Sequence, residues 1–173
     1  MPDAASPFQA YVASLMEALG ARDPLEVLAD TPAELRRVVA GLTPAQERAP
    51  EAPGRWSARQ VLQHLADSEL VGAFRFRMIL AHDAPELPAY DQDAWADRLR
   101  YQEVEAATAL ADFTALRAAN LRLLRRATPE DLRRVMHHAE RGDEALGQMI
   151  ALYAGHDLVH LEQLRRAIQA AGA

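Results

Sequence analysis

The sequence of 173 residues contains no cysteine and no uninterrupted apolar run long enough to cross a bilayer. Without cysteine there can be no disulfide framework, no Cys-ligated zinc site and no protein thiol nucleophile, so any metal must be bound by His, Asp or Glu. The first residues, MPDAASPFQA, also lack the basic and apolar regions of a secretory signal. We therefore expect a cytoplasmic protein with no membrane partner.

Positive charge is in deficit: 19 Lys and Arg residues stand against 25 Asp and Glu residues, which gives a net charge of −6. Proteins that bind a phosphate backbone need the opposite balance, so nucleic acid is not expected as a partner. The length, with half of the residues hydrophobic, suits one globular domain over 1–173 with its core over about 23–170.

Strand signals are scarce, whereas helix start signals recur. No segment shows sustained period-two alternation or an Asn-Gly turn. Instead, a capping residue is followed by Pro and, two residues after that Pro, by Gln, Glu or Asp; this pattern begins at Ser6, Asp23, Thr31, Thr43 and Thr128. The capping oxygen accepts an orphaned backbone N–H, and Pro fits the first helical position because no donor is needed there. The sequence therefore predicts an all-α fold.

Four long helices are predicted, and smaller elements surround them. The long helices cover about 24–40, with a possible break at Thr31-Pro32, 57–82, 102–126 and 143–170; a short N-terminal helix covers 7–19, and small turns lie near 44–48, 92–97 and 129–135. The connection over 82–102 is unusually long for a bundle loop, and loops of that length are commonly functional or crossover segments. We interpret it as a crossover, which predicts that the second and third helices run parallel.

Three histidines could meet inside such a bundle. His156 and His160 are four residues apart, so their rings project side by side from one helix. His64 lies about 10 Å along the second helix and His160 about 15 Å from the end of the fourth, at ~1.5 Å per residue, so antiparallel packing would bring the rings to a similar height. Three neutral imidazoles with an open position suit Zn(II), Ni(II), Co(II) or Fe(II). Histidines satisfied by hydrogen bonds alone are the structural alternative.

Two other metal chemistries fit less well. The stretch HDLVH is one methylene from the H-E-x-x-H signature of zinc proteases, but Asp157 is shorter than Glu, and Glu162, the sole possible third ligand after it, is turned away. A di-iron carboxylate bundle needs Glu-x-x-His motifs on two helices, and the chain has none. Peptidase and di-iron chemistry are therefore disfavoured.

Several ordered motifs together resemble a known family. They are Trp56-Ser57, HLADSE from His64, HAERGD from His138 and GHDLVHL from Gly155, and the likeness runs from about Asp23 to Leu164. This set resembles the DinB/YfiT-like superfamily. The resemblance implies a four-helix bundle of up-down-down-up topology with a metal, usually nickel or zinc, bound by His64, His156 and His160. It also implies that homodimers are common.

The resemblance leads to a first functional hypothesis. Some relatives transfer low-molecular-weight thiols such as bacillithiol or mycothiol to electrophiles, which implies a metal-dependent S-transferase acting on a small-molecule substrate. The metal would bind the sulfur of the thiol and lower its pKa. Arg75, Tyr90, Asp91 and Trp95 could face the pocket.

Two alternatives remain open. The first is a hydrolase that uses metal-bound hydroxide, with Asp67, Glu69, Asp157 or His138 as the proton carrier. The second is a non-catalytic helical module that the metal stabilises, serving as a sensor or a dimer partner.

Overall fold

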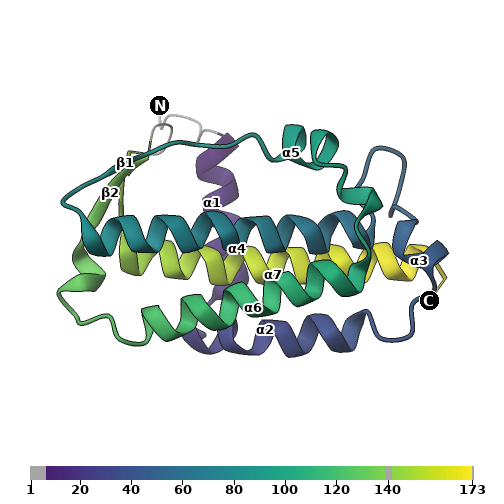
Figure 1. Ribbon diagram of the computed structural model, residues 1–173, viewed down its shortest axis with the longest axis horizontal. Helices are drawn as coiled ribbons and strands as arrows, with labels where there is room; N and C mark the ends of the chain where they lie inside the picture. The colour runs from purple at the N-terminus through teal and green to yellow at the C-terminus, as the bar shows by residue number, and fades with distance from the viewer. Residues whose placement is uncertain (1–6, 139–141, 173) are drawn as a thin grey trace.

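Four long helices pack side by side in the computed structural model, which describes residues 7–138 and 142–172. They are α2 (Pro24–Val38), α4 (Ala58–Ala81), α6 (Ala106–Leu124) and α7 (Leu146–Ala170). Figure 1 shows that α2 and α7 run in one direction along the bundle, while α4 and α6 run in the other. The chain is therefore an all-α four-helix bundle of up-down-down-up topology, as predicted.

Helix starts follow the predicted capping chemistry. The Asp23 carboxylate accepts hydrogen bonds from the backbone N–H groups of Leu25 and Glu26 at the start of α2. Thr43 begins α3 (Pro44–Arg48) and Ser57 begins α4, each in a complete capping box with the Gln three residues later. These starts are confirmed because each cap satisfies donors that the first helical turn leaves without partners.

The possible break of α2 at Pro32 does not occur. Proline has no N–H, so the carbonyl four residues earlier, that of Leu28, loses its helical hydrogen bond. In the structure, the Arg117 guanidinium of α6 donates to the Leu28 oxygen at 2.8 Å. The Thr31 hydroxyl does not cap a new helix; it donates to the backbone oxygen of Val27 at 2.8 Å, within α2. A tertiary contact thus replaces the missing bond, and the helix continues.

The connection between α4 and α6 carries the predicted crossover. It includes β1 (Glu86–Leu87), α5 (Gln92–Arg98) and the 3₁₀ helix η1 (Tyr101–Glu103). Figure 1 shows this segment passing along the bundle, so that α6 begins at the same end as α4. Asp91 starts α5 by accepting from the N–H groups of Asp93 and Ala94, both at 3.0 Å. Residues expected to open the third helix near 102 form η1, and α6 begins only at Ala106.

A small sheet at one end of the bundle was not predicted. The 3₁₀ helix η2 (Asp131–Arg133) leads into β2 (Val135–His138), which pairs with β1 in parallel and with β3 (Gly142–Ala145) antiparallel. His137 and His138, which precede the fourth helix in the sequence, therefore belong to a strand, β2. Strands of two to four residues are too short for period-two alternation to be recognised.

The apolar core is divided into two clusters by a polar layer. One cluster includes Phe76, Leu124 and Met149, and the other includes Leu62, Phe113 and Leu164. Between them lie the buried polar residues of the middle of the bundle: Thr31, His64, Ser68, Glu69, Arg117, Asn120, Asp157 and His160. Buried polar groups must be paired to be tolerated, so this layer is where a function is to be sought.

The N-terminal helix α1 (Pro7–Leu19) lies across α7 at this middle layer (Figure 1). Gly155 allows the close approach, because a Cβ at this position would lie only 2.2 Å from the Leu15 carbonyl oxygen. Among the described helices, none is long and apolar enough to cross a membrane.

Candidate metal centre

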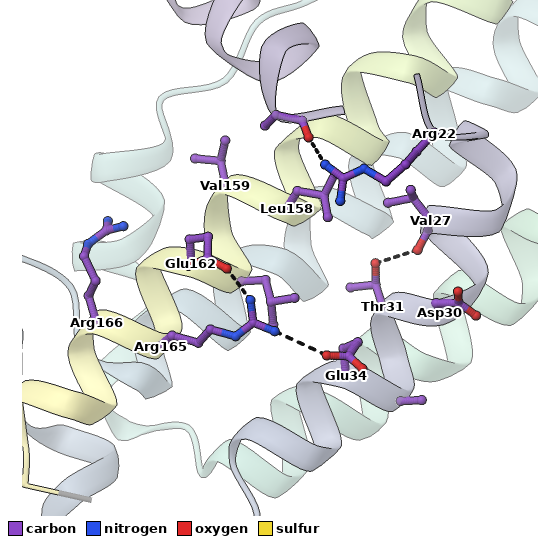
Figure 2. Close-up of a pocket in the computed structure, with 13 residues that line it drawn as sticks. Arg22, Val27, Asp30, Thr31, Glu34, Leu158, Val159, Glu162, Arg165 and Arg166 are labelled. Atoms are coloured by element: carbon purple, nitrogen blue, oxygen red, sulfur yellow. Dashed lines mark hydrogen bonds and ion pairs between the residues drawn. The ribbon is translucent and has the colours of Figure 1, made fainter. Parts of the chain in front are cut away.

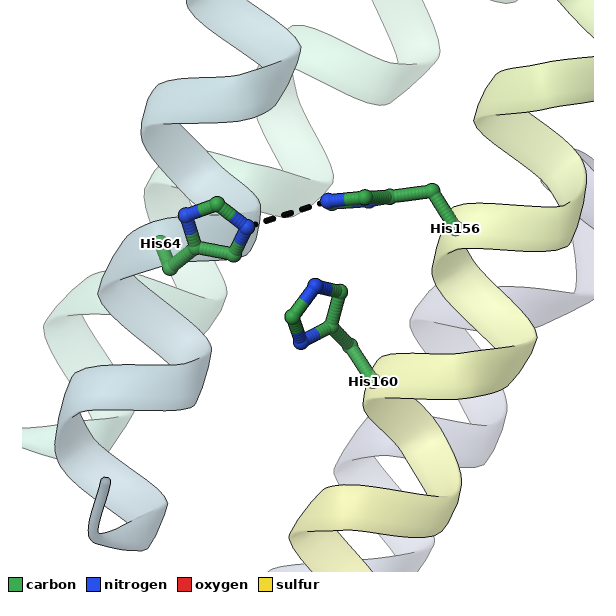
Figure 3. Close-up of side chains that lie close together, drawn as sticks. All are labelled: His64, His156 and His160. Atoms are coloured by element: carbon green, nitrogen blue, oxygen red, sulfur yellow. Dashed lines mark hydrogen bonds between the residues drawn. The ribbon is translucent and has the colours of Figure 1, made fainter. Parts of the chain in front are cut away.

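The imidazoles of His64 on α4 and of His156 and His160 on α7 meet in the middle of the bundle. One nitrogen from each ring can be chosen so that all three lie within 4.8 Å of one another. The Nε2 atoms of His64 and His156 are 3.0 Å apart, and the ring centroids are separated by 4.2 to 5.0 Å. Figure 3 shows a nitrogen of His160 pointing toward the gap between the other two rings. The structure thus brings together the three predicted ligands.

Burial keeps all three imidazoles in the neutral form. Burial is the main cause that lowers the pKa of His64 and of His156 well below 6.5, and the neighbouring imidazoles lower these values further. The pKa of His160 is also lowered by burial, although its hydrogen bond to Gln163 and the carboxylate of Asp157 act in the opposite direction. A neutral imidazole is the form that binds a metal ion.

The donor set fits a divalent transition metal. His160 Nδ1 contacts Gln163 Oε1 at 2.7 Å, which places the ring proton on Nδ1 and leaves the Nε2 lone pair free to bind a metal. Nδ1 of His64 and Nδ1 of His156 are buried without a hydrogen-bond partner in the described part of the chain. Histidines retained only for structure would be expected to have their nitrogens satisfied. The cluster therefore resembles a ligand set more than a completed hydrogen-bond network.

A cavity of about 370 Å³ borders the histidines. It is lined from α1 by Leu15, from α4 by Ser68 and Arg75, from the crossover by Tyr90, and from α7 by Tyr153 and His156. His64 and His160 are 1% and 8% exposed, whereas His156 is only partly buried because it lines this space. The indole of Trp56 covers another side of the cluster, stacked on His160 with 6.5 Å between centroids. The centre is thus closed by protein on one side and open to a small molecule through His156.

A buried ion-pair network adjoins the ligand helices. The Arg117 guanidinium, 1% exposed, binds Asp157 through two hydrogen bonds of 2.6 and 3.0 Å and donates to Glu69 at 3.0 Å. Asn120 donates to the second oxygen of Glu69 at 3.0 Å. Burial alone would lower the pKa of Arg117, but the two carboxylates outweigh it and raise that pKa. The network ties α6 to both helices that carry the histidines.

Two of the four predicted proton carriers, Asp67 and Glu69, have different hydrogen-bond partners. Asp67 accepts from the Tyr101 hydroxyl at 2.5 Å and from the Gln63 amide at 3.0 Å. Glu69 has both carboxylate oxygens engaged in the Arg117 network. His138 is the last residue of β2, and its side chain lies outside the described residues. A catalytic role for Asp67, Glu69 or His138 stays a prediction.

Of the four other residues expected to face a pocket, two line the cavity and two do not. Arg75 and Tyr90 line the cavity at His156. Asp91 caps α5, and Trp95 packs against Tyr90 with 4.6 Å between ring centroids. The crossover therefore contributes Tyr90 to the lining of the cavity, and Trp95 packs against the ring of Tyr90.

A more voluminous cavity lies elsewhere. It measures about 710 Å³ and lies between α1, α2 and α7, and none of the three histidines lines it. Figure 2 shows that some of its charged side chains are engaged: Arg165 pairs with both Glu162 and Glu34, and Arg22 donates to a backbone oxygen. No histidine lines this groove, so we place the chemistry at the smaller cavity.

Comparison with known proteins agrees with this geometry. The family model of the DinB superfamily matches residues 28–164. The chain belongs to the DinB superfamily. YfiT of Bacillus subtilis is 29% identical to this DinB-superfamily protein over 147 residues, 82% of either chain. A protein of Oceanobacillus iheyensis is 32% identical over 136 residues, 78% of either chain. Both relatives are named as candidate metal-dependent hydrolases.

The bundle topology of this DinB-superfamily protein also has a counterpart of known structure. The structure of Bacillus subtilis YfiT matches with a TM-score of 0.80 and 25% identity, over 99% of this chain and 93% of the YfiT chain. YfiT is described as a candidate metal-dependent hydrolase with an unusual four-helix bundle topology. The direction of α4 and α6, set by the crossover, is the feature that departs from an ordinary antiparallel bundle.

Sequence reasoning missed two parts of this DinB-superfamily site. Arg117 and Asn120 were not singled out, although a cation within the apolar face of α6, between Phe113 and Leu121, is a readable signal of a buried ion pair. Tyr153 was not singled out either, and nothing in its neighbours along the chain shows that it lines a cavity.

Proposed function

We propose that this protein is a metal-dependent hydrolase whose substrate is a small molecule bound in the cavity at His156. The observation that carries the proposal is the meeting of three neutral imidazoles beside a cavity of about 370 Å³. The names of the relatives, candidate metal-dependent hydrolases, support the same class of reaction.

Each histidine would supply one nitrogen ligand, and Zn(II) or Ni(II) suits such a set. When bound, the ion would act as a Lewis acid and lower the pKa of water toward neutrality. The chain itself holds the three rings neutral by burial, orients His160 through Gln163 and packs Trp56 against His64 and His160. One side of the cluster opens to the cavity, which leaves room for substrate.

Transfer of a low-molecular-weight thiol is the second candidate. It remains a prediction. The absence of cysteine from the chain supports it, because a reaction that needs a thiol would have to take that thiol from a separate small molecule. The two reactions share the metal centre and differ in the nucleophile. They are therefore distinguished by whether turnover requires a thiol.

The test measures turnover by protein loaded with Zn(II) or Ni(II). A panel of nitrophenyl carboxylic and phosphoric esters is assayed without thiol, and consumption of monobromobimane is assayed with bacillithiol or mycothiol. We expect metal-dependent ester hydrolysis that is lost in His64→Ala and retained in His82→Ala, since His82 is an exposed residue at the end of α4.

Three outcomes would redirect the proposal. Turnover only with thiol would favour the transferase, and turnover that survives His64→Ala would remove the metal mechanism. No turnover, combined with a large loss of melting temperature on chelation, would favour the non-catalytic module.

A further inference from the structure

Tyr153 lines the cavity of the metal centre, one helical turn before His156. The two ring centroids are 6.5 Å apart, and both side chains line the cavity. Residues three apart on a helix share one face, so the position of Tyr153 follows that of the metal ligand. A buried tyrosine hydroxyl normally has a hydrogen-bonding task, and none of the roles assigned so far includes this one.

Gly72 on α4 makes room for this ring. A Cβ at Gly72 would lie 2.7 Å from Tyr153 Cε1 and 3.1 Å from its hydroxyl oxygen. Glycine inside a helix is less favourable than alanine by about 1 kcal/mol, so its presence here has a packing reason. The Tyr153 ring also packs against the ring of Phe76, with 5.2 Å between the two centroids. The hydroxyl is therefore held at one position.

The direction of its hydrogen bond decides what the hydroxyl can offer. The Arg75 guanidinium lies close enough to the Tyr153 hydroxyl to lower its pKa through charge and hydrogen bonding. A guanidinium has donors only, so the Tyr153 oxygen must be the acceptor and its own hydrogen must point elsewhere. Both residues line the cavity, and the hydroxyl can therefore donate to a molecule within it.

We infer that the Tyr153 hydroxyl binds the oxyanion that forms on the substrate, which makes a carboxylic ester or amide the expected substrate class. This inference rests on the proposed hydrolase function. Burial raises the pKa of Tyr153 although Arg75 acts in the opposite direction, so the hydroxyl remains a donor at neutral pH.

The hydroxyl acts while the carbonyl is attacked. Attack of a water oxygen on the carbonyl carbon moves the π electron pair onto the carbonyl oxygen, which the Tyr153 O–H then binds. When that electron pair re-forms the double bond, the bond to the alcohol or amine breaks. The leaving group takes the proton that the water lost, and Tyr153 keeps its own proton throughout. A preplaced donor of this kind stabilises the transition state more than the bound substrate.

The first experiment measures binding, which does not depend on turnover. Phenylphosphonate, a stable oxyanion, is titrated into wild type and Tyr153→Phe by calorimetry, with and without Zn(II). We expect about 10- to 100-fold weaker binding by Tyr153→Phe in both states, because the donor belongs to the chain. The matched control is Tyr101→Phe, which removes a hydroxyl that binds Asp67 outside the cavity and should leave phosphonate affinity unchanged.

The second experiment uses the gap at Gly72. Gly72→Ala should displace the phenol and weaken phosphonate binding in the wild-type background, but cause no further loss in Tyr153→Phe, because the two changes remove the same contact. With nitrophenyl esters, kcat should fall by about 10²-fold in Tyr153→Phe while KM changes little.

The outcomes for Tyr153 and for the hydrolase are separable. Equal or absent phosphonate affinity in wild type and Tyr153→Phe overturns the inference, whatever the turnover. Tyr153-dependent phosphonate binding without metal-dependent ester hydrolysis would keep the oxyanion subsite and overturn the proposed function.

Discussion

The Asp157 carboxylate forms a two-point ion pair with the Arg117 guanidinium. The distances are 2.6 Å from Nη1 to Oδ2 and 3.0 Å from Nη2 to Oδ1, and the side chains are 1% and 2% exposed. Asp157 stands where a zinc protease of the H-E-x-x-H class has its general base. Here it joins α7 to α6 through Arg117.

Removing one partner of this pair should destabilise the protein strongly. Arg117→Met leaves Asp157 and Glu69 buried without their cation, and Asp157→Asn removes one of the two carboxylates. We expect a loss of about 3–5 kcal/mol for Arg117→Met and a smaller one for Asp157→Asn, measured by urea unfolding. Arg37→Ala, which breaks an exposed pair with Glu34, is the control and should change stability by less than about 1 kcal/mol. A loss for Arg117→Met as small as that of the control would contradict a structural role for the network.

Metal binding should raise the melting temperature of the wild-type protein. An ion that binds only the folded state stabilises it by about 2.7 kcal/mol at a concentration of 100 times its Kd. We expect Zn(II) or Ni(II) to produce this rise, and chelation to reverse it, in calorimetric scans. The double variant His156→Ala/His160→Ala should show no rise, whereas His137→Ala should behave as wild type because His137 pairs with Asp143 on the exposed hairpin. Metal contents by elemental analysis should follow the same order.

The stability of the metal-free protein should decrease as the pH falls below about 6.5. The pKa values of the three histidines are lowered in the folded state, so between those values and 6.5 the unfolded chain binds more protons. Protonation then favours unfolding, and the stability present above pH 6.5 is lost on acidification through this window. Urea midpoints at pH 7.5, 6.5 and 5.5 test this, and His64→Gln should show a shallower decrease. A wild-type stability that is flat over this range would show that the imidazoles are not held neutral.

Gly155 should not tolerate even one added methyl group. A Cβ at this position would lie 2.2 Å from the backbone oxygen of Leu15, and α1 would have to move away from α7. We expect Gly155→Ala to lose about 1–3 kcal/mol and to make α1 susceptible to limited proteolysis. Gly147→Ala is the comparator on the same helix, because its nearest backbone oxygen, that of Leu132, would be 3.3 Å away. Equal stability of both variants would show that the close crossing of α1 is not required.

The capping-residue and proline patterns made most helix starts predictable, because the hydrogen-bond partners of a capping side chain lie within three residues of it. Ser57 with Gln60 and Thr43 with Gln46 form the expected boxes. Thr31 follows the same pattern without starting a helix, since Arg117 from another helix satisfies the carbonyl that Pro32 leaves open. The strands β1 to β3 were missed because each has only two to four residues, and because β1 pairs with β2, a segment far from it in the chain.

The three histidines could be identified from spacing and helix length, but their surroundings could not. The i,i+4 spacing determines that His156 and His160 share a helix face, and the resemblance to the DinB/YfiT-like superfamily adds His64. The sequence by itself thus determined the all-α class, most helix starts and the set of candidate ligands, because each depends on local geometry. Only the tertiary structure decided that Asp157 pairs with Arg117 and that Gly72 admits the phenol of Tyr153 beside the cavity. These contacts join residues on different helices, and their distances and burial are set by packing, which local sequence patterns do not encode.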